Sequence, residues 1–307
     1  MDPTTKIIWD KYASNPIPSL AVKPGSWRAD ASMTVDLIER DDRYQIFYVG
    51  KAGGKDAIGI ASCLKDVFDG ISWEDYAENP VVSPGEPGIF DSKHAVDPAA
   101  LVHDGKIFLY YSALGDGPDS IGLAISEDGI HFKKQAKPVL VGRAPEVVKT
   151  DDTIYLLYSM DNPKGGYEFH LATSTNGIDF KVEGPVFTPD SAGWDSLSVV
   201  TPRIFFDSGI YIMSYAGDDK EKDYPTHFGF AFSKDMRTWK RFAGNPVFSG
   251  GAEGSWESRA IWYPEVFKHQ GRYYMWYEGH DGKRSQVGMA VSQSPIVEIG
   301  LAALEIG

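Results

Sequence analysis

The chain has 307 residues, of which 42% are hydrophobic and 24% charged, the composition of an ordinary globular protein with enough length for a large core. Its net charge of −13 argues against a nucleic acid or an anionic membrane as a partner, because both require a basic surface. Cys63 is the one cysteine, which excludes an internal disulfide bond, and no stretch approaches the roughly 20 apolar residues of a membrane helix. The N-terminal segment has no basic region followed by an apolar run, so we expect a cytoplasmic protein without a signal peptide.

A strand–turn–strand unit recurs five times along the chain. In the second copy, residues 95–112, a buried strand leads through a turn at Asp104-Gly105 into a second strand that ends on paired tyrosines. Every copy places a tyrosine thirteen residues after a fixed position, here called the proline position: Val35 and Tyr48, Pro98 and Tyr111, Pro145 and Tyr158, Pro202 and Tyr215, and Pro264 and Tyr277. Five copies in one register indicate a repeat architecture.

Each copy continues into a third strand and then an outer strand. The third strand has a small-residue signature, found in residues 58–62, 121–126, 170–174, 228–233 and 287–292. In the first four copies a turn and an aromatic residue follow, at Trp73, Phe132, Phe180 and Trp239, and then a proline–valine pair. The pattern therefore predicts four strands in each repeat.

The fifth copy lacks its outer strand, and the missing piece stands at the other end of the chain. Residues 9–16 match residues 73–80 almost letter for letter. We infer that the N-terminal strand completes the last repeat and closes a ring, which removes free sheet edges. The prediction is an all-β protein, a five-bladed β-propeller that forms one domain over residues 1–307. The best helix candidate is the tail, residues 295–306.

In a propeller the first strand of each blade lines the central channel, and its side chains alternate between the channel and the sheet. The positions directly before the proline position are Thr34, Asp97, Ala144, Thr201 and Tyr263, and those directly after it are Asp36, Ala99, Glu146, Arg203 and Glu265. Because the two sets are two residues apart, we expect them to share a face, with four carboxylates around Arg203. An unpaired buried charge is costly, so this face forms either a structural ring of salt bridges through Arg203 or a pocket for a polar ligand. Two carboxylates in such a pocket are what cleavage of a glycosidic bond requires.

A second recurring mark lies eight residues before the proline position, at Trp27, Phe90, Trp194 and Trp256. Acidic residues follow it at Asp91, Asp195 and Glu257, and an aromatic and acidic rim suits the binding of sugar faces and hydroxyls. Because these acids recur, they are interpreted as blade-packing residues, and so are the five repeated tyrosines. Side chains found in a single blade are the better ligand candidates, and these are Asp30, Lys93, His94, Arg143, Arg259 and Trp262.

Other signals of chemistry are weak. The chain has no phosphate-binding loop, no GxSxG motif and no HExxH motif. Its histidines are scattered without the spacing of metal ligands. We therefore predict neither a metal ion nor a cofactor.

The second repeat resembles a known group, the five-bladed propeller glycosidases of glycoside hydrolase families 32, 43, 68, 117 and 130. The resemblance covers nearly the whole chain through its repeats, and its specific part is residues 95–98 followed by residues 104–106 and the tyrosine pair 110–111. In several of these families the aspartate before the proline is catalytic or tunes the acid, which the resemblance carries onto Asp97.

Two departures from the pattern of families 32 and 43 narrow the comparison. Families 32 and 43 place the acid glutamate where this chain has Arg143, and the aspartate of the first blade is replaced by Thr34, between Asp30 and Asp36. The pair Pro145-Glu146 is closer to family 130, which contains mannoside phosphorylases and hydrolases. A phosphorylase also needs basic residues for phosphate, and the candidates are Arg143, Arg203 and Arg259.

The leading hypothesis is a glycoside hydrolase that acts on small glycosides or oligosaccharides, furanosides included. Asp97 is the principal catalytic candidate, Glu146 the general acid, and Asp30 or Asp36 the base or nucleophile. The predicted sugar-binding residues are His94, Arg203, Glu265, Arg143, Arg259, Trp262 and Trp27. Two alternatives stay open, a mannoside phosphorylase of the family 130 type and a non-catalytic sugar-binding propeller. The sugar, its anomer and the oligomeric state are left open by the sequence.

Overall fold

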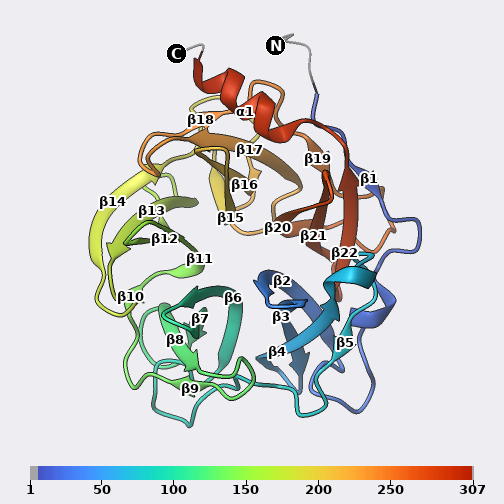
Figure 1. The fold of residues 1–307 in the computed structure, drawn as a ribbon, viewed down its shortest axis with the longest axis vertical. Helices are drawn as coiled ribbons and strands as arrows, with labels where there is room; N and C mark the ends of the chain where they lie inside the picture. The colour runs from blue at the N-terminus through green and yellow to red at the C-terminus, as the bar shows by residue number, and fades with distance from the viewer. Residues whose placement is uncertain (1–5, 306–307) are drawn as a thin grey trace.

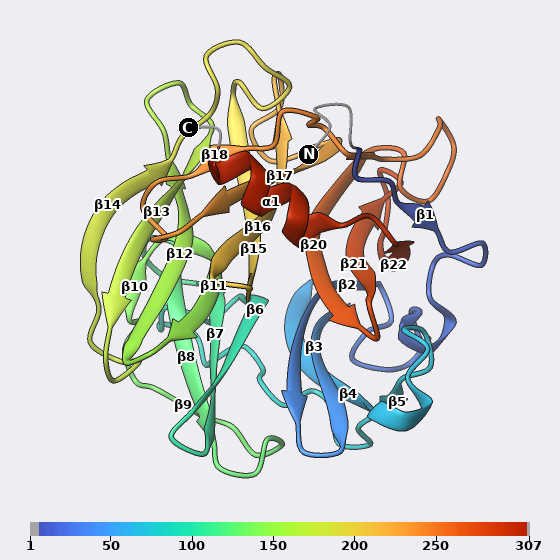
Figure 2. The same ribbon diagram turned by 45° about the horizontal axis from the view of Figure 1, so that its top comes forward.

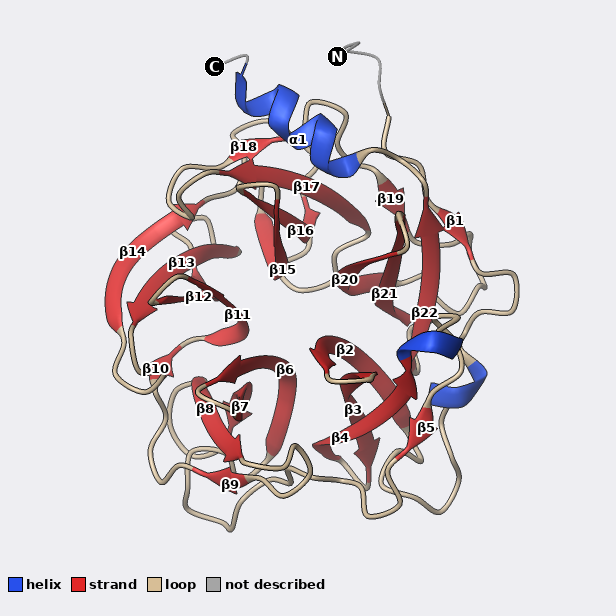
Figure 3. Ribbon diagram, in the orientation of Figure 1, coloured by secondary structure: helices blue, strands red, loops and turns tan. Residues whose placement is uncertain are grey.

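The computed structural model describes residues 6–305. Strands dominate it (Figure 3), and the helices within these residues are the short η1 (Pro18–Leu20) and η2 (Lys65–Val67) and the C-terminal α1 (Ile296–Glu305). The all-β prediction and the predicted C-terminal helix are confirmed, except that residue 306 lies outside the described residues. None of these helices is long and apolar enough to cross a membrane. The cytoplasmic location stays a prediction.

The strands follow the predicted repeats, in groups arranged around a common centre (Figure 1). The first group contains β2 (Ala31–Arg40), β3 (Arg43–Ala52), β4 (Lys55–Leu64) and β5 (Glu74–Asp75). The second contains β6 (His94–His103), β7 (Lys106–Leu114), β8 (Ser120–Ser126), β9 (Lys133–Lys134) and β10 (Leu140–Val141). The third contains β11 (Arg143–Thr150), β12 (Thr153–Asp161), β13 (Tyr167–Ser174) and β14 (Lys181–Phe187).

The fourth group contains β15 (Ser198–Asp207), β16 (Ile210–Asp218), β17 (His227–Ser233), β18 (Lys240–Arg241) and β19 (Phe248–Ser249). The fifth contains β20 (Ala260–His269), β21 (Arg272–His280) and β22 (Ser285–Ser292). The helix α1 packs against β16 and β17 on the outside of the fourth group (Figure 2). Within each group the first three strands pair antiparallel in succession, as the short turns between them require, and the outer strands pair antiparallel with the third.

The N-terminal strand β1 (Asp10–Lys11) joins the fifth group. It pairs antiparallel with β22, with Asp10 opposite Val291 and Lys11 opposite Ala290, as predicted. The Asn15 side chain then brackets the backbone of Met289, donating to its carbonyl at 2.8 Å and accepting from its amide at 2.9 Å. Asn79 brackets Ile60 in the same way, so the similarity of residues 9–16 and 73–80 reflects one packing solution used twice.

The innermost strands of the five groups are β2, β6, β11, β15 and β20 (Figure 1), and each contacts the next around the centre, with β20 returning to β2. No sheet closes on itself within residues 6–305, and a parallel pair between Asp56 and His94 joins the first two groups into one sheet. The five-bladed propeller and the single domain over residues 1–307 therefore stay predictions, taken up again below.

Between neighbouring groups lies the apolar core. The repeated tyrosines Tyr48, Tyr111, Tyr158, Tyr215 and Tyr277 are all buried, as predicted. The Tyr111 hydroxyl donates to Asp91 at 2.9 Å and the Tyr215 hydroxyl donates to Asp195 at 3.0 Å, so these recurrent acids satisfy buried hydroxyls. Trp27 packs over Gly50 and Gly59, where the ring leaves no room for a Cβ atom.

The residue before the proline position has a left-handed backbone in every inner strand. The φ angles are 41° at Thr34, 56° at Asp97, 49° at Ala144, 53° at Thr201 and 52° at Tyr263. At each of these points the register with the next strand shifts, as in a β-bulge. A bulge interrupts the two-residue alternation of side chains. The expectation that the residues before and after the proline position share one face is therefore wrong.

Candidate active site

The bulges divide the predicted site into a solvent-facing cavity and a buried cluster. The first, here called the central cavity, has a volume of about 350 Å³. Its polar and aromatic walls consist of Thr34, Lys51, Asp56, Asp97, Arg143, Thr201, Asp223, Tyr224, Trp262, Tyr263 and Glu278. Four of the five residues before the proline position are among them. A concave site with convergent carboxylates, cations and aromatic rings is suited to a polar ligand.

Asp97, the principal catalytic candidate predicted from the sequence, is a buried carboxylate that lines this cavity. Its residue is 6% exposed, and the oxygen Oδ2 has no hydrogen-bond partner within residues 6–305. The left-handed backbone at Asp97 is unfavourable before Pro98, since a residue that precedes proline prefers extended geometry. All five repeats share this strained backbone, but only here does it aim an acidic side chain at the cavity. Asp97 is thus held ready to bind a ligand group.

Arg143 lines the same cavity as Asp97. Its Nη1 atom donates to the Tyr167 hydroxyl at 3.0 Å and lies 3.3 Å from an oxygen of Asp223. Burial raises the pKa of Asp223 above its usual value, and the positive charge of Arg143 opposes that shift. The guanidinium remains charged at any pH at which the protein is folded, so it can attract an anion.

Arg143 also lines a second cavity of about 320 Å³, here called the side cavity. Lys222 and Tyr167 line it too, and the Lys222 ammonium lies 4.5 Å from the centroid of the Tyr167 ring. The buried hydroxyl of Ser159, a further lining residue, has no hydrogen-bond partner within residues 6–305. Two cations and an unpaired hydroxyl donor therefore line this space, together with the carboxylates of Asp119 and Asp161. The Lys222 ammonium is paired with Asp161 at 2.6 Å.

Glu278 was missed by the sequence reasoning. It accepts hydrogen bonds from Thr34 Oγ1 at 2.9 Å and Ser285 Oγ at 2.6 Å and forms no ion pair within residues 6–305. Burial raises the pKa of Glu278 to about 7, with a further contribution from the negative charges of Asp97 and Asp56. It therefore exchanges a proton near neutral pH. A signal was available, because the residue after the repeated tyrosine is Val49, Ser112, Ser159 or Ala216 in the other repeats.

The residues after the proline position form the other part, the Arg203 cluster, made of Arg203, Asp36, Glu146 and Glu265. Arg203 is 1% exposed, and its guanidinium pairs with Glu146 at 3.0 Å and with Glu265 at 3.2 Å. It also donates to the carbonyls of Val35 at 3.2 Å and Pro98 at 3.0 Å. One side chain thus connects all five inner strands.

The carboxylates of the Arg203 cluster also bind backbone amides of the next strand. Asp36 accepts from Ala100 N and Glu146 accepts from Ile204 N, both at 2.8 Å. Burial raises the pKa of Asp36 to about 6 and that of Glu146 to about 8, and one guanidinium does not neutralise three buried carboxylates. None of the cluster residues lines the central cavity. The geometry therefore favours the salt-bridge alternative for these four residues over the catalytic and sugar-binding roles expected for them.

The remaining predicted residues divide between the cavity and its surroundings. Trp262 lines the central cavity, and Arg259 lies just outside, 4.4 Å from the centroid of the Tyr224 ring. The Nδ1 atom of His94 lies 2.8 Å from an oxygen of Asp56, so His94 borders the cavity through that carboxylate. Asp30 accepts from the Gly53 amide at 2.9 Å in a turn outside the cavity.

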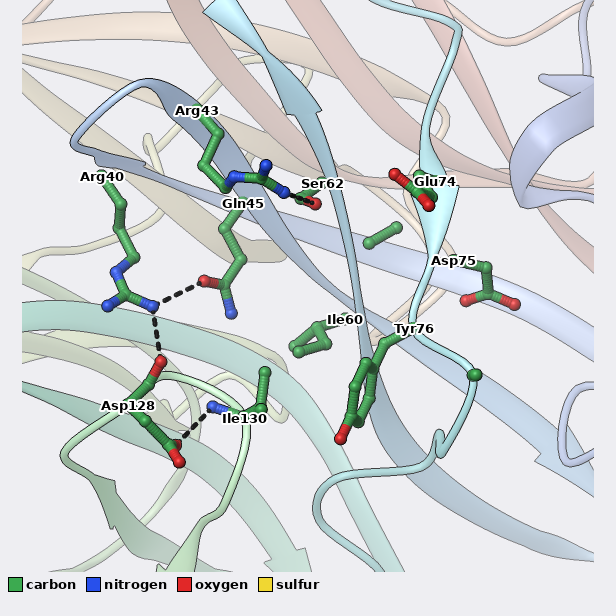
Figure 4. Close-up of a pocket in the computed structure, with 12 residues that line it drawn as sticks. Arg40, Arg43, Gln45, Ile60, Ser62, Glu74, Asp75, Tyr76, Asp128 and Ile130 are labelled. Atoms are coloured by element: carbon green, nitrogen blue, oxygen red, sulfur yellow. Dashed lines mark hydrogen bonds between the residues drawn. The ribbon is translucent and has the colours of Figure 1, made fainter.

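A larger cavity of about 480 Å³ lies away from these residues, between the first two groups of strands (Figure 4). There Arg40 donates to Gln45 Oε1 at 3.3 Å and to the carbonyl of Asp128 at 2.9 Å. Arg43 donates to Ser62 Oγ at 3.0 Å. Both arginines of this cavity are thus bonded within its wall, and its lining includes none of the predicted site residues. Size alone therefore does not identify the active site.

A metal site in a protein is built from a group of side chains whose ligand atoms surround one point. Within residues 6–305, no group of three or more His, Cys, Asp or Glu side chains has the geometry to hold a metal ion. The acids of the central cavity are interleaved with Arg143 and Lys51, which compete with a cation.

Comparison with known proteins narrows the family. The family described as β-1,4-mannooligosaccharide phosphorylase, glycoside hydrolase family 130, matches residues 153–298. An uncharacterised protein of Mycobacterium tuberculosis is 26% identical over 289 residues, covering 87% of this chain and 94% of that protein. A 1,2-β-oligomannan phosphorylase of Thermoanaerobacter is 26% identical over 233 residues, covering 69% of this chain and 73% of that enzyme.

A solved structure extends the likeness to the fold. The β-1,2-mannobiose phosphorylase from Listeria innocua, in complex with β-1,2-mannobiose, superposes with a TM-score of 0.75 at 14% identity. The alignment covers 96% of this chain and 99% of that one. Among the families that the sequence resembles, these comparisons support family 130. They also favour the phosphorylase alternative over the hydrolase that was the leading hypothesis.

Proposed function

We propose that this protein is a β-mannoside phosphorylase of the family 130 type, built as a single five-bladed propeller, that transfers a mannosyl group from an oligosaccharide to inorganic phosphate. The observation that carries the proposal is the position of Arg143, which lines both the central cavity with Asp97 and the side cavity, where it and Lys222 lie over the same Tyr167 ring. An anion bound between Arg143 and Lys222 would lie next to the sugar site and would compete with Asp161 for the Lys222 ammonium. Arginine and lysine are the residues that bind phosphate most readily.

The reaction assigns each residue a distinct task. The bond between the anomeric carbon and the glycosidic oxygen breaks, and a phosphate oxygen forms a new bond to the same carbon. Asp97 is assigned to the leaving oxygen, which must receive a proton as it departs. Arg143 is assigned to the phosphate, whose charge it offsets during attack. The products are a mannose 1-phosphate and an oligosaccharide that is one sugar shorter.

A hydrolase is the second candidate, and Glu278 is the observation that favours it. A hydrolase that inverts configuration needs a carboxylate that takes a proton from water, at some distance from the acid. Glu278 lines the same cavity as Asp97 and exchanges a proton near pH 7. The predicted acid Glu146 is a weaker candidate for such a role, because it is paired with Arg203.

The test is the phosphate dependence of turnover. β-1,4- and β-1,2-linked mannobiose are each incubated with the protein, with and without inorganic phosphate, and the products are separated by anion-exchange chromatography. We expect mannose 1-phosphate and mannose in equal amounts, and no cleavage without phosphate. Arg143→Met should abolish the reaction in phosphate. Cleavage at the same rate without phosphate would support the hydrolase, and no cleavage of either mannobiose would overturn the proposal.

A further inference from the structure

The loop between β16 and β17, residues 219–226, distinguishes the fourth repeat from the others. It contains eight residues, whereas the corresponding loops span residues 53–54, 115–119, 162–166 and 281–284. Residues unique to one repeat are the ones that the repeat architecture itself does not require. The extra length delivers two side chains, Asp223 and Tyr224, to the central cavity.

Both neighbouring strands anchor this loop. The carbonyl of Lys222 accepts from Ser198 Oγ at 2.7 Å, and the carbonyl of Pro225 accepts from Ile261 N at 2.9 Å. At its start, Asp218 Oδ1 accepts from the amides of residues 220 and 221 at 2.8 and 2.9 Å. The backbone of the loop is therefore held in place across β15 and β20, and its side chains have defined positions.

Tyr224 is an aromatic side chain presented at the mouth of the cavity. It is 41% exposed and is among the exposed large hydrophobic side chains of the described residues. The Arg259 guanidinium lies 4.4 Å from its ring centroid and is held there by Glu221 at 3.1 Å. The Trp262 ring meets it edge-on at 5.6 Å. These neighbours fix the orientation of the ring while solvent still reaches it.

The depths of Asp97 and Tyr224 differ within one cavity. Asp97 is 6% exposed and acts, in the proposed reaction, on the bond to the leaving sugar. A sugar attached through that bond extends from Asp97 toward the mouth, where Tyr224 stands. Aromatic faces pack well against the C–H face of a sugar ring, and the guanidinium and hydroxyl nearby can bind its hydroxyls.

We propose that Tyr224, supported by Trp262 and Arg259, binds the second sugar of the substrate and so makes the enzyme selective for oligosaccharides over simple mannosides. This inference rests on the proposed function, since it takes the reacting sugar to lie at Asp97. It adds a specificity residue and the loop of residues 219–226 that carries it.

The experiment compares Tyr224→Ala, Tyr224→Phe and the unchanged protein on methyl β-mannoside and on mannobiose, in phosphate. We expect Tyr224→Ala to raise the KM for mannobiose about tenfold, the loss of one aromatic contact, with kcat within about twofold. The ratio kcat/KM for methyl β-mannoside should stay the same. Tyr224→Phe keeps the ring and should behave as the unchanged protein. The matched control is Phe206→Ala, another exposed aromatic, at 44%, outside the cavity.

Two results would overturn the inference: an unchanged KM for mannobiose in Tyr224→Ala, or an equal loss for both substrates. Failure of the proposed function looks different, because the unchanged protein would then cleave no mannoside. In that case mannobiose affinity is measured by titrating the tryptophan fluorescence. A tenfold weaker affinity of Tyr224→Ala would keep Tyr224 as a sugar contact, and equal affinities, or no binding by either protein, would exclude it.

Discussion

The central cavity and the Arg203 cluster contain the same kinds of side chains and differ in what those side chains face. In the cluster, Glu146 and Glu265 both face one buried guanidinium, and Arg203 has further bonds to backbone carbonyls. In the cavity, Asp97 has an oxygen without a partner and Glu278 has only hydroxyl donors. A charge that is satisfied by its own chain stabilises the fold, whereas an unsatisfied one is available to a ligand.

The bulge in each inner strand creates this division. Asp97 and Ala99 are two residues apart, as are Ala144 and Glu146, but the left-handed backbone at Asp97 and Ala144, with its shift of register, breaks the alternation of side chains. The residues before the proline position face the cavity, and those after it face the neighbouring strands. The comparison predicts that changes in the cavity affect turnover and that changes in the cluster affect stability.

The largest effect is expected from Asp97→Asn. Loss of a carboxyl group that transfers a proton should reduce kcat by roughly 10²- to 10⁴-fold, while the melting temperature stays close to that of the unchanged protein. Asparagine tolerates a left-handed backbone, so the bulge at φ 56° is preserved. Turnover of mannobiose in phosphate and thermal unfolding are both measured.

Asp151→Asn is the matched control, because Asp151 also has a left-handed backbone, at φ 53°, in the exposed turn between β11 and β12. It should change neither quantity. Full activity in Asp97→Asn would remove Asp97 from the site. A large fall in its melting temperature would instead move Asp97 to the structural side of the comparison.

Next in size is Arg203→Met, which leaves Asp36, Glu146 and Glu265 buried without their cation. Breaking a buried ion pair on one side costs roughly 3–5 kcal/mol, so the melting temperature should fall steeply or the protein should fail to fold. Arg203→Lys, which retains the charge but loses the contacts to several strands, should be intermediate. Thermal unfolding followed by circular dichroism measures both.

Arg143→Met provides the contrast from the cavity. Its partner Asp223 is partly exposed, so loss of this pair should cost no more than about 1 kcal/mol of stability while turnover in phosphate is lost. A stable but inactive Arg203→Met would show that the cluster, too, serves the reaction.

The sequence predicted features that recur in the five repeats, but it did not predict the bulges or all of the residues that differ in a single repeat. The burial of the repeated tyrosines, the pairing of β1 with β22 and the place of Asp97 in the central cavity all follow from positions that recur or from a motif around them. The bulges could not be inferred, because β-branched and aromatic residues rarely adopt a left-handed backbone, yet Thr34, Thr201 and Tyr263 do so here. Glu278 and the loop of residues 219–226 could have been predicted, because each differs from its counterparts in the other repeats.

The last prediction is a pH dependence of stability. Glu146, with its pKa raised to about 8, and Asp36, with its pKa raised to about 6, keep protons in the folded protein that they release in the unfolded chain near pH 4. Their stabilising contribution is complete below the unfolded pKa and is lost as the pH rises through about 6 to 8. The slope should approach about 1.4 kcal/mol per pH unit while one proton separates the two states.

The melting temperature should therefore fall between pH 5 and pH 8.5. Variants of single carboxyl groups show which group causes this fall. Glu146→Gln should flatten the upper part of this range most. Glu278→Gln, in the cavity, removes a group with a pKa of about 7 and should act mainly around neutrality. If Glu278→Gln removed the whole slope and Glu146→Gln none of it, the cavity rather than the Arg203 cluster would hold the protons that link pH to stability. The division between a structural and a functional set of carboxylates would then be wrong.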